Sequence, residues 1–435
     1  MKLNYKRTIL LGFAFLSICA FWQFYDNEIP KMLKYNFSLG ETATGAIMAL
    51  DNVFALFLLP IFGALSDRTN TRLGKRMPYI LCGTSMAVVF LIVLIQVAKP
   101  SGNLIFFIAV LLLLLVSMGI YRSPAVSLMP DLTPAPLRSA GNAIINLMGA
   151  LGGVFTLVMT IFLVKSTDDP SKTNYTPLMF SIVILMVVAI LIVFVSIKEN
   201  KIKSEIEKEG GLQSLGEEIE NSIETTSKGT KLPRDVFKSL AFLLASVSFW
   251  FMAYNAVTTA YTRYVEEVWH LTGGGYAKTM LIATGAAVLS YIPIGSLSSK
   301  IGRKKTILSG IALMNVCYLI AAFMAQYSPS INIFFALIGI GWAAINVNSY
   351  PMVVEMSKAG DIGKYTGTYY TFSMAAQVFT PILSGILLEY VSYRTLFPYA
   401  VVFSALAFCT MSMVKHGDVK PPKKDKILEN FDVDD

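Results

Sequence analysis

The sequence predicts an all-α membrane protein of twelve transmembrane helices, arranged as two similar six-helix bundles. The chain has 435 residues, of which 54% are hydrophobic and 15% charged, so it is more apolar than a typical soluble domain. Twelve apolar runs are about 20 residues long, enough to cross about 30 Å of hydrocarbon. The charged segment GALSDRTNTRLGKRMP at Gly63 to Pro78 has a shorter copy, GSLSSKIGRKK, at Gly295 to Lys305. This copy indicates a duplicated bundle.

The twelve runs fall into two sets of six on either side of a polar segment. We place the first six near 8–29, 42–65, 78–98, 103–130, 140–164 and 176–197. The second six lie near 236–262, 277–299, 305–326, 331–355, 364–389 and 395–414. We therefore predict an N-terminal bundle at 1–197, a linker at 198–235, a C-terminal bundle at 236–414 and a tail at 415–435.

The linker has no aromatic residue and mixes many Glu with many Lys, so it buries too little apolar surface to form a core. Isoleucines and a leucine recur there at helical spacing, at Ile202, Ile206, Leu215, Ile219 and Ile223. An amphipathic helix and a solvated tether are equally good interpretations. We expect the tail to be disordered from Lys415.

The distribution of basic residues predicts the orientation of the chain. Of the 36 lysines and arginines, 27 fall at the N-terminus, in the loops on the same side and in the tail, and eight, including Lys31 and Arg263, fall in the opposite loops. Positive residues concentrate on the cytoplasmic side, so we expect both termini to be cytoplasmic in a cell (inner or plasma) membrane. The net charge of +8 then reflects orientation and not nucleic-acid binding. The basic, apolar N-terminus lacks a signal-peptide cleavage site, which favours a retained first helix.

Several kinds of chemistry find no support in the sequence. The four cysteines lie far apart in apolar runs, and neither His270 nor His416 falls inside a predicted helix, so no metal site is expected. The chain also lacks a phosphate-binding loop that ends in lysine and Ser or Thr, which argues against ATP as the energy source. We expect neither a cofactor nor enzymatic activity.

The segment Gly63 to Pro78, which we call the charged loop, has the composition of a gate. An acid among basic side chains at helix ends can form charge-assisted bonds in one conformation and lose them in another. The alternative is that the loop only satisfies the positive-inside rule. The gating residues that we predict are Gly63, Asp67, Arg68, Arg72, Gly74, Lys75, Arg76 and Asp131 in the first half, and Gly295, Gly302, Arg303, Lys304 and Glu355 in the second.

The charged loop and its neighbours resemble a known family. The turn G-x-x-x-D-R followed by G-K-R is similar to the loop between helices 2 and 3 of the major facilitator superfamily. The longer form SDRTNTRLGKRMP, with DNVFALFLLP before it, resembles the glycoside-pentoside-hexuronide cation symporters and the sucrose-transporter-like branch. The segment RSPAVSLMPDLTPAPLRSAGNAIINLMG at Arg122 to Gly149 does so too. The resemblance spans nearly the whole chain and implies the major facilitator fold and cation-coupled sugar uptake.

The coupling ion is less clear from the resemblance. The melibiose carrier of this family has two acids one turn apart in helix 2, and Ala55 and Leu59 stand in those places here. The resemblance therefore does not extend to a sodium site of that kind, and we expect a proton instead.

Charged side chains inside predicted helices are the best candidates for coupling, because a lone charge in hydrocarbon costs several kcal/mol. Asp26, Asp51 and Arg122 qualify. A buried carboxylate beside an arginine can take up and release a proton, so we predict that Asp51 or Asp26 is the coupling acid. Arg122 would sense its charge or bind sugar hydroxyls. The alternatives are a permanent ion pair between helices and, for Asp26, an ordinary place at the membrane interface.

Sugar recognition needs flat aromatic faces for C–H surfaces and amides for hydroxyl groups. Such residues recur at i, i+4 spacing on several predicted helices, and each alone is more typical of helix packing. The substrate-binding residues that we predict are Trp22, Gln23, Asn142, Asn146, Trp250, Tyr254, Asn255, Trp342, Asn346, Tyr350 and Gln377.

Together these features predict a secondary active transporter that imports a disaccharide or other small glycoside with a proton, by alternating access between its two bundles. We expect a monomer. One alternative is a carrier or exporter of a non-sugar solute in the same superfamily. The other is a membrane sensor or scaffold that transports nothing.

Overall fold

A computed structural model describes residues 4–99, 102–133, 137–208, 233–356 and 362–418 of the chain. Within these residues, twelve helical segments are long and apolar enough to cross a membrane, which confirms the predicted all-α membrane fold. The chain divides into two compact units. The first holds residues 1–215 and 271–278, and the second holds residues 216–270 and 279–435.

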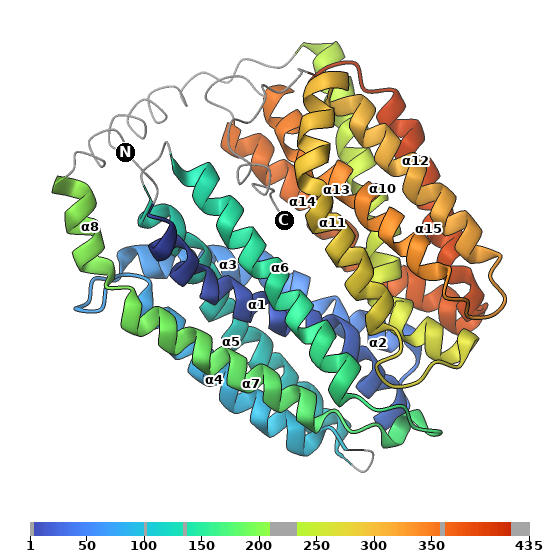
Figure 1. Cartoon of the computed structure of the whole chain (residues 1–435), viewed down its shortest axis with the longest axis horizontal. Coiled ribbons are helices and arrows are strands. Elements are labelled where there is room, and N and C mark those ends of the chain that lie inside the picture. The colour runs from blue at the N-terminus through green and yellow to red at the C-terminus, as the bar shows by residue number, and fades with distance from the viewer. Residues whose placement is uncertain (1–3, 100–101, 134–136, 209–232, 357–361, 419–435) are drawn as a thin grey trace. The chain divides into compact units, whose positions relative to one another are not determined.

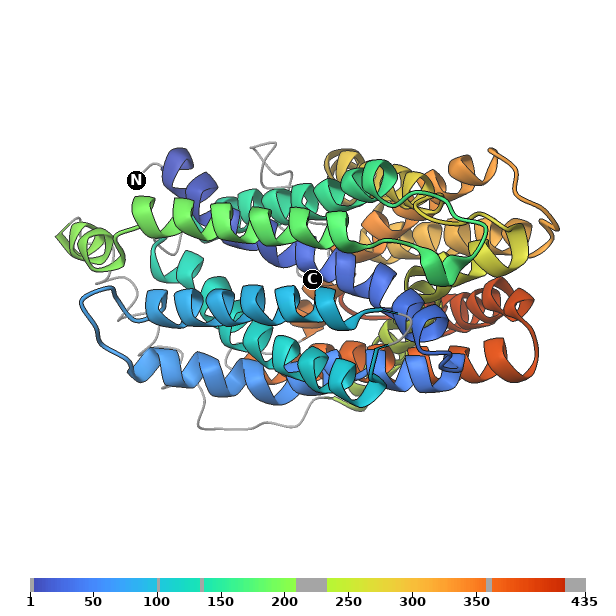
Figure 2. The same cartoon turned by 90° about the horizontal axis from the view of Figure 1, so that it is seen from below.

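The first unit contains six of the spans (Figures 1 and 2). Its spans are formed by α1 (Tyr5–Lys31) with the π-helical turn η1 (Met32–Asn36), α2 (Glu41–Met48) with α3 (Leu50–Arg68), α4 (Met77–Val97), α5 (Leu104–Asp131), α6 (Arg138–Leu163) and α7 (Thr176–Ser196). A short 3-10 turn, η3 (Pro170–Lys172), precedes α7. The helix α8 (Glu199–Lys208) follows α7 directly.

The second unit contains the other six spans (Figure 1). Its helices are α10 (Arg234–Trp269), α11 (Ala277–Ile301), α12 (Arg303–Ala322), α13 (Ile331–Met356), α14 (Ile362–Tyr390) and α15 (Leu396–Ser412), with the 3-10 turn η5 (Tyr393–Thr395) before α15. The backbone hydrogen bonds of a helix form within the helix itself, which is why apolar runs in lipid take this form.

Local signals explain where several helices begin. The side chain of Asn4 accepts a hydrogen bond from the backbone N–H of Arg7 at the start of α1, and that of Asn103 accepts one from Phe106 at the start of α5. Proline stands in the first turn of α4 and α7, where its missing N–H has no helical partner to lose. The predicted spans agree with the observed helices to within a few residues at most ends.

Two helices run further than the sequence indicated. The helix α10 continues beyond residue 262 to Trp269 and includes Arg263, whose Nη1 donates to the Thr259 carbonyl at 2.8 Å. The helix α1 continues beyond residue 29 to Lys31. Counting Arg263 and Lys31 among the loop residues was wrong, since both lie within helices and are buried with polar partners.

The linker and the tail are more ordered at their starts than predicted. The helix interpretation holds for residues 199–208, where Ile202 and Ile206 are buried, while Leu215, Ile219 and Ile223 lie outside the described residues. The prediction of disorder from Lys415 is wrong for residues 415–418. The backbone N–H of Lys415 donates to Ser239 Oγ at 3.1 Å, and His416 Nδ1 lies 2.8 Å from the same oxygen.

Close helix contacts in the first unit depend on glycine. Its apolar core is built mainly from α1, α4, α5 and α7, with Phe21, Leu91 and Leu111 fully buried. The helix α6 packs on α1 through Gly152, where an added methyl group would lie 2.8 Å from the carbonyl carbon of Leu16. Small residues at such crossings let two backbones approach, and the resulting van der Waals packing is one of the forces that hold helices together in a membrane.

We predict that Gly152→Ala destabilises the folded protein, because the added methyl group must push α1 and α6 apart. Overpacking of this kind costs about 1–3 kcal/mol, so the apparent melting temperature of the purified protein should fall by roughly 5 °C. Gly285→Ala is the matched control, since an added methyl group there meets nothing within 4 Å. Equal melting temperatures for both variants would contradict the packing role of Gly152.

Candidate functional site

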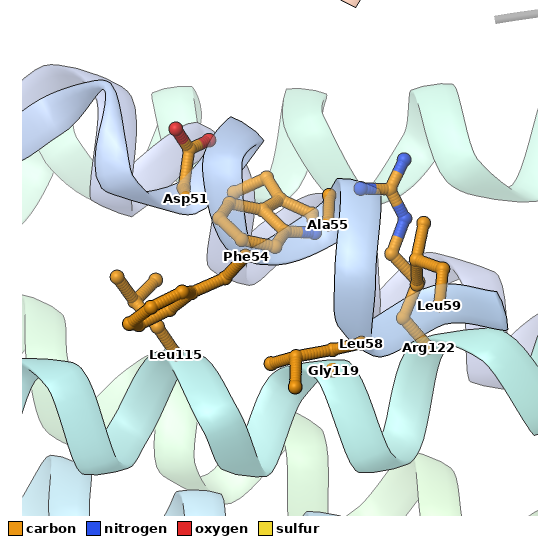
Figure 3. A pocket seen from close by; sticks show the side chains of 9 residues that line it. Asp51, Phe54, Ala55, Leu58, Leu59, Leu115, Gly119 and Arg122 are labelled. Carbon is orange, nitrogen blue, oxygen red and sulfur yellow. The ribbon is translucent and has the colours of Figure 1, made fainter. Parts of the chain in front are cut away.

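Three charged or aromatic residues predicted to act in coupling or binding line one pocket of the first unit (Figure 3). They are Trp22 from α1, Asp51 from α3 and Arg122 from α5. Apolar residues and one glycine complete the wall: Phe54, Ala55, Leu58, Leu59, Leu115 and Gly119. We call this the acid–arginine pocket.

The charged groups of the acid–arginine pocket interact with each other and with Asp26, which does not line the pocket. Asp26 and Asp51 interact electrostatically with each other and with Arg122. Asp51 Oδ1 also accepts hydrogen bonds from the backbone N–H and Nδ2 of Asn52, at 2.6 and 2.7 Å. The guanidinium carbon of Arg122 lies 5.7 Å from the ring centroid of Trp22, within the range of a cation–π contact. Two acids therefore share one arginine beside an aromatic face.

In the second unit the structure brings some of the predicted sugar-binding residues together. The rings of Tyr254 and Trp342 stack in parallel with centroids 3.8 Å apart, and Phe251 packs edge-on to Trp342 at 5.4 Å. Asn346 follows one turn along α13 and is buried. Tyr350, a further turn on, contacts the rings of Tyr369 and Tyr370 on α14.

The remaining predicted binding residues lie elsewhere in their units. Trp250 is only 1% exposed, so its ring packs in the core of the second unit. Gln23 lies near Gly153 of α6, where a Cβ atom would be 3.4 Å from Gln23 Oε1. The partly buried residues Asn142 and Asn146 are on α6, Asn255 is on α10 and Gln377 is on α14.

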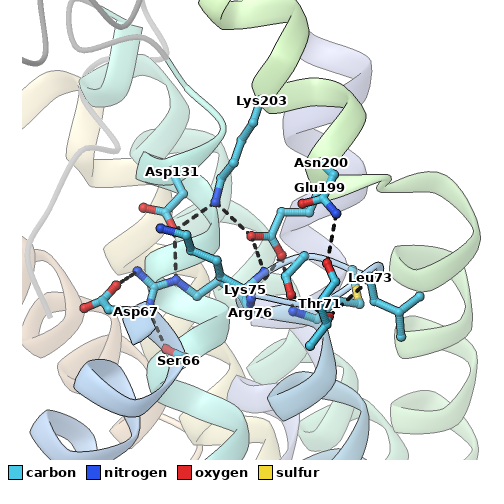
Figure 4. Close-up of polar contacts among 12 residues, drawn as sticks. Ser66, Asp67, Thr71, Leu73, Lys75, Arg76, Asp131, Glu199, Asn200 and Lys203 are labelled. Atoms are coloured by element: carbon cyan, nitrogen blue, oxygen red, sulfur yellow. Dashed lines mark hydrogen bonds and ion pairs between the residues drawn. The ribbon is translucent and has the colours of Figure 1, made fainter. Parts of the chain in front are cut away.

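The charged loop forms a dense polar network around Arg76, which is 5% exposed (Figure 4). Its Nε donates to Asp131 Oδ2 at 2.8 Å, its Nη2 donates to Asp67, and its Nη1 donates to Ser66 and, at 3.2 Å, to the Gly63 carbonyl. Burial alone would lower the pKa of Arg76, but Asp131 and Asp67 outweigh it and raise the pKa. The guanidinium thus joins the ends of α3, α4 and α5.

The other predicted gating residues of the loop have smaller parts in this network. Gly74 has a φ of +111°, a conformation that favours glycine. Arg68, Arg72 and Lys75 are exposed. The Asp67 side chain is itself 61% exposed, and exposed ion pairs contribute little to stability. Asp131 is therefore the more important partner of Arg76.

Glu199, which the sequence did not single out, fastens α8 to the charged loop (Figure 4). Its carboxylate accepts hydrogen bonds from the backbone N–H groups of Lys75 and Arg76 at 2.8 and 3.0 Å, and from Lys203 Nζ at 2.9 Å. Asn200 Nδ2 donates to the carbonyls of Thr71 and Arg72. Burial alone would raise the pKa of Glu199, but these bonds outweigh it and lower the pKa.

The second unit repeats this layout with different residues. Arg303, at the start of α12, donates to Glu355 near the end of α13. Gly302 has a φ of +96°, and the backbone N–H of Lys304 donates to Asp418 Oδ1 at 2.9 Å. Lys304 Nζ also donates to the carbonyls of Ser412 and Val414, at 2.9 and 2.6 Å. Gly295 lies within α11. Asp418 thus occupies the place that Glu199 has in the first unit.

A buried ion pair lies at the C-terminal end of α1. Glu28 and Lys31 are both fully buried, with Lys31 Nζ 3.4 Å from Glu28 Oε2. Tyr276 donates its hydroxyl hydrogen to Glu28, and Lys31 Nζ donates to the Gly273 carbonyl at 3.1 Å. Lys31 Nζ also lies 5.6 Å from the ring centroid of Tyr175. We call these five residues the Glu28–Lys31 cluster.

The Glu28–Lys31 cluster holds the segment 271–278, which belongs to the first unit although it joins α10 and α11. The Gly274 N–H donates to the Val164 carbonyl at 3.0 Å, and Ser166 Oγ donates to the Thr272 carbonyl at 3.1 Å. The sequence offered one signal for this cluster, an acid and a base three residues apart at the end of an apolar run. Without the fold, such a pair is typical of a solvated helix end.

Comparisons with known proteins agree with this architecture. A family model described as MFS/sugar transport protein matches residues 15–414. The chain is 23% identical over 375 residues to the glucuronide carrier protein homolog of Escherichia coli, which covers 83% of this chain and 73% of that protein. It is 26% identical over 159 residues to the chloramphenicol resistance protein CraA of Acinetobacter baumannii, 36% of this chain and 38% of that one. Over the matched stretches, the chain spans only 24% to 38% of the length of three curated relatives.

Among solved structures, the inward-open xylose transporter XylE from E. coli is similar with a TM-score of 0.66 at 15% identity. The likeness covers 98% of both chains. At this identity it establishes the fold and carries no information about the substrate.

We predict that Glu199→Gln releases α8 from the charged loop, because the charge-assisted bonds at Glu199 are lost. Removing such bonds costs about 2 kcal/mol, so amide hydrogen exchange in residues 199–208 should accelerate roughly 30-fold. Glu205→Gln is the matched control, since its carboxylate is half exposed and lies 4.0 Å from Lys201 Nζ. Unchanged exchange in Glu199→Gln would refute the fastening role.

The same contact should respond to pH in one direction only. The pKa of Glu199 is lowered in the folded protein, so its stabilising effect is fully present above the ordinary value of 4.5 and is lost as the pH falls through the lowered pKa. The protection factors of residues 199–208, which divide out the intrinsic pH dependence of amide exchange, should therefore stay constant between about pH 5 and about pH 8 and fall only at strongly acidic pH.

Proposed function

Because the chain belongs to the MFS/sugar transport protein family of the major facilitator superfamily, we propose that it transports a sugar across a cell membrane together with a proton. The chain is a multi-pass membrane transporter and not an enzyme. The proposed substrate is a disaccharide or other small glycoside. The protein would take it up by symport and would act as a monomer. Both termini would lie in the cytoplasm, following the distribution of basic residues.

The acid–arginine pocket is the observation that carries the proposal of proton coupling. Asp26 and Asp51 lie near one arginine, and one cation cannot neutralise two carboxylates. A proton on one acid would balance the charge, and its loss would return the site to a net negative state. Binding and release of a proton would thus decide which conformation of the pocket is stable in an apolar surrounding.

Polar and aromatic side chains support a sugar as the substrate. Trp22 beside Arg122 in the first unit and the Tyr254–Trp342 stack in the second have flat faces that suit the C–H surfaces of a sugar ring. Asn346 adds an amide one turn from Trp342. The glucuronide carrier relative, whose name gives a sugar derivative as its substrate, agrees with this chemistry.

The polar networks at the two ends of the first unit support alternating access. Arg76 with Asp67 and Asp131, and Arg303 with Glu355 in the second unit, would hold one state of the carrier. The Glu28–Lys31 cluster would hold the opposite end of the first unit. A transport cycle would break these sets of bonds in turn, because a set that never broke would stop the carrier in one state.

One observation favours a second candidate function, the export of a non-sugar solute. The partial match to a chloramphenicol resistance protein is consistent with a carrier of drug-like compounds. Such a carrier should accept apolar amphiphiles and exchange no sugar.

We predict that sugar added to de-energised proteoliposomes makes the external solution more alkaline, because each sugar enters with a proton. A panel of mono- and disaccharides would identify the substrate in the same measurement. Asp51→Asn or Asp26→Asn should abolish the pH change and pH-driven accumulation while keeping sugar counterflow, because exchange needs no net proton movement.

Asp168→Asn is the matched control, since this aspartate is exposed outside the spans. Full pH-driven uptake by both Asp51→Asn and Asp26→Asn would remove these acids from the coupling role. Sugar uptake that follows a sodium gradient would overturn proton coupling. Counterflow of chloramphenicol but of no sugar would favour the exporter.

We predict that Trp342→Ala weakens sugar binding, because it removes the ring that stacks on Tyr254. Contact with one aromatic face is worth about 0.5–1.5 kcal/mol, so losing the contact between Trp342 and the sugar should raise the half-saturating sugar concentration in counterflow about two- to tenfold. Phe323→Ala, at an aromatic residue 82% exposed, controls for general effects. Normal sugar affinity in Trp342→Ala would remove the stack from the binding site.

A further inference from the structure

A second pocket of the first unit lies between the charged loop and the junction of α7 with α8. Its apolar floor is formed by Met77 and Ile197, which are buried. Leu73, Phe194 and Val195 form the outer apolar wall and are 45%, 40% and 70% exposed. We call this the basic pocket, because its remaining polar wall is mainly cationic.

Three exposed basic side chains border the basic pocket: Arg72 from the charged loop, Lys198 after α7 and Lys201 in α8. The acid in its wall is Glu199, whose carboxylate is fully buried and already bonded to Lys203 and to the N–H groups of Lys75 and Arg76 (Figure 4). Glu205, which does not line the pocket, has its Oε1 atom 4.0 Å from Lys201 Nζ. The mouth of the pocket therefore carries a net positive charge.

The position of the basic pocket places this charge at the edge of the hydrocarbon. The α7 span ends at Ser196, so Phe194 and Val195 lie in its last turn, where their apolar side chains are exposed on the surface. Lys198 and Lys201 follow within five residues of that end. Basic residues directly beyond a transmembrane helix attract the anionic headgroups of the adjacent leaflet.

We propose that the basic pocket binds an anionic phospholipid, with its phosphate group between Arg72, Lys198 and Lys201 and its acyl chains along Phe194 and Val195. A free phosphate ion would satisfy the basic side chains but leave the apolar wall uncovered, and a neutral lipid would do the reverse. The bound lipid would bridge the charged loop and α8, the two segments that Glu199 and Asn200 already join. Lipid composition would then bear on the stability of that junction.

Native mass spectrometry of the full chain with defined lipids tests this inference without any measurement of transport. We expect the wild-type protein to retain phosphatidylglycerol at least tenfold better than Lys198→Gln/Lys201→Gln, since each basic residue near the surface contributes an energy of about 1 kcal/mol. Lys198→Arg/Lys201→Arg should retain the lipid, because the charge is kept. Thermal melting of both variants would check that the fold is intact.

The matched control is Lys165→Gln/Lys172→Gln, which removes two exposed lysines from another loop. Equal loss of lipid in this control would overturn the inference, because binding would then follow net charge alone. Equal retention of phosphatidylcholine would overturn headgroup recognition. Displacement of the lipid by millimolar inorganic phosphate would assign the site to a free anion.

Discussion

Charge in an apolar surrounding is the constraint on which the rest of the structure depends. A charged side chain without a partner costs several kcal/mol in hydrocarbon, and the pairs described above accordingly stand where helices must be joined. Glu28 and Lys31 close one end of α1, and Arg76 joins three helix ends at the charged loop. The remaining set, two acids with Arg122, is unbalanced, and this imbalance is what gives the pocket a chemical task.

The two units solve the same problem with different sequences. In each, an arginine at the start of the third span binds an acid near the end of the fourth, as Arg76 binds Asp131 and Arg303 binds Glu355. In each, an acid that follows the sixth span accepts backbone hydrogen bonding at the start of the third: Glu199 from Lys75 and Arg76, and Asp418 from Lys304. The repeat is therefore one of chemistry and position and not of sequence, because Glu199 comes from the linker and Asp418 from the tail.

The sequence predicted what depends on composition and local pattern. Apolar runs located the twelve spans, and the predicted gating set contained Arg76, Asp67 and Asp131 without indicating that Arg76 pairs with both acids. It missed Glu199 and Asp418 because each stands among many like residues, and only the fold shows which one reaches a helix start. Trp250 and Trp342 illustrate the same limit. Both belong to stripes at i, i+4 spacing, yet Trp250 is buried in the core and Trp342 stacks on Tyr254.

The segment 271–278 makes the connectivity between the two units discontinuous. The backbone passes from one unit to the other at 215–216, again at 270–271 and a third time at 278–279. A protein cut within the linker would thus yield two fragments. The second fragment would still contain residues 271–278, which pack as part of the first unit. The bonds of Tyr276 to Glu28 and of Lys31 to the Gly273 carbonyl would then hold the two fragments together.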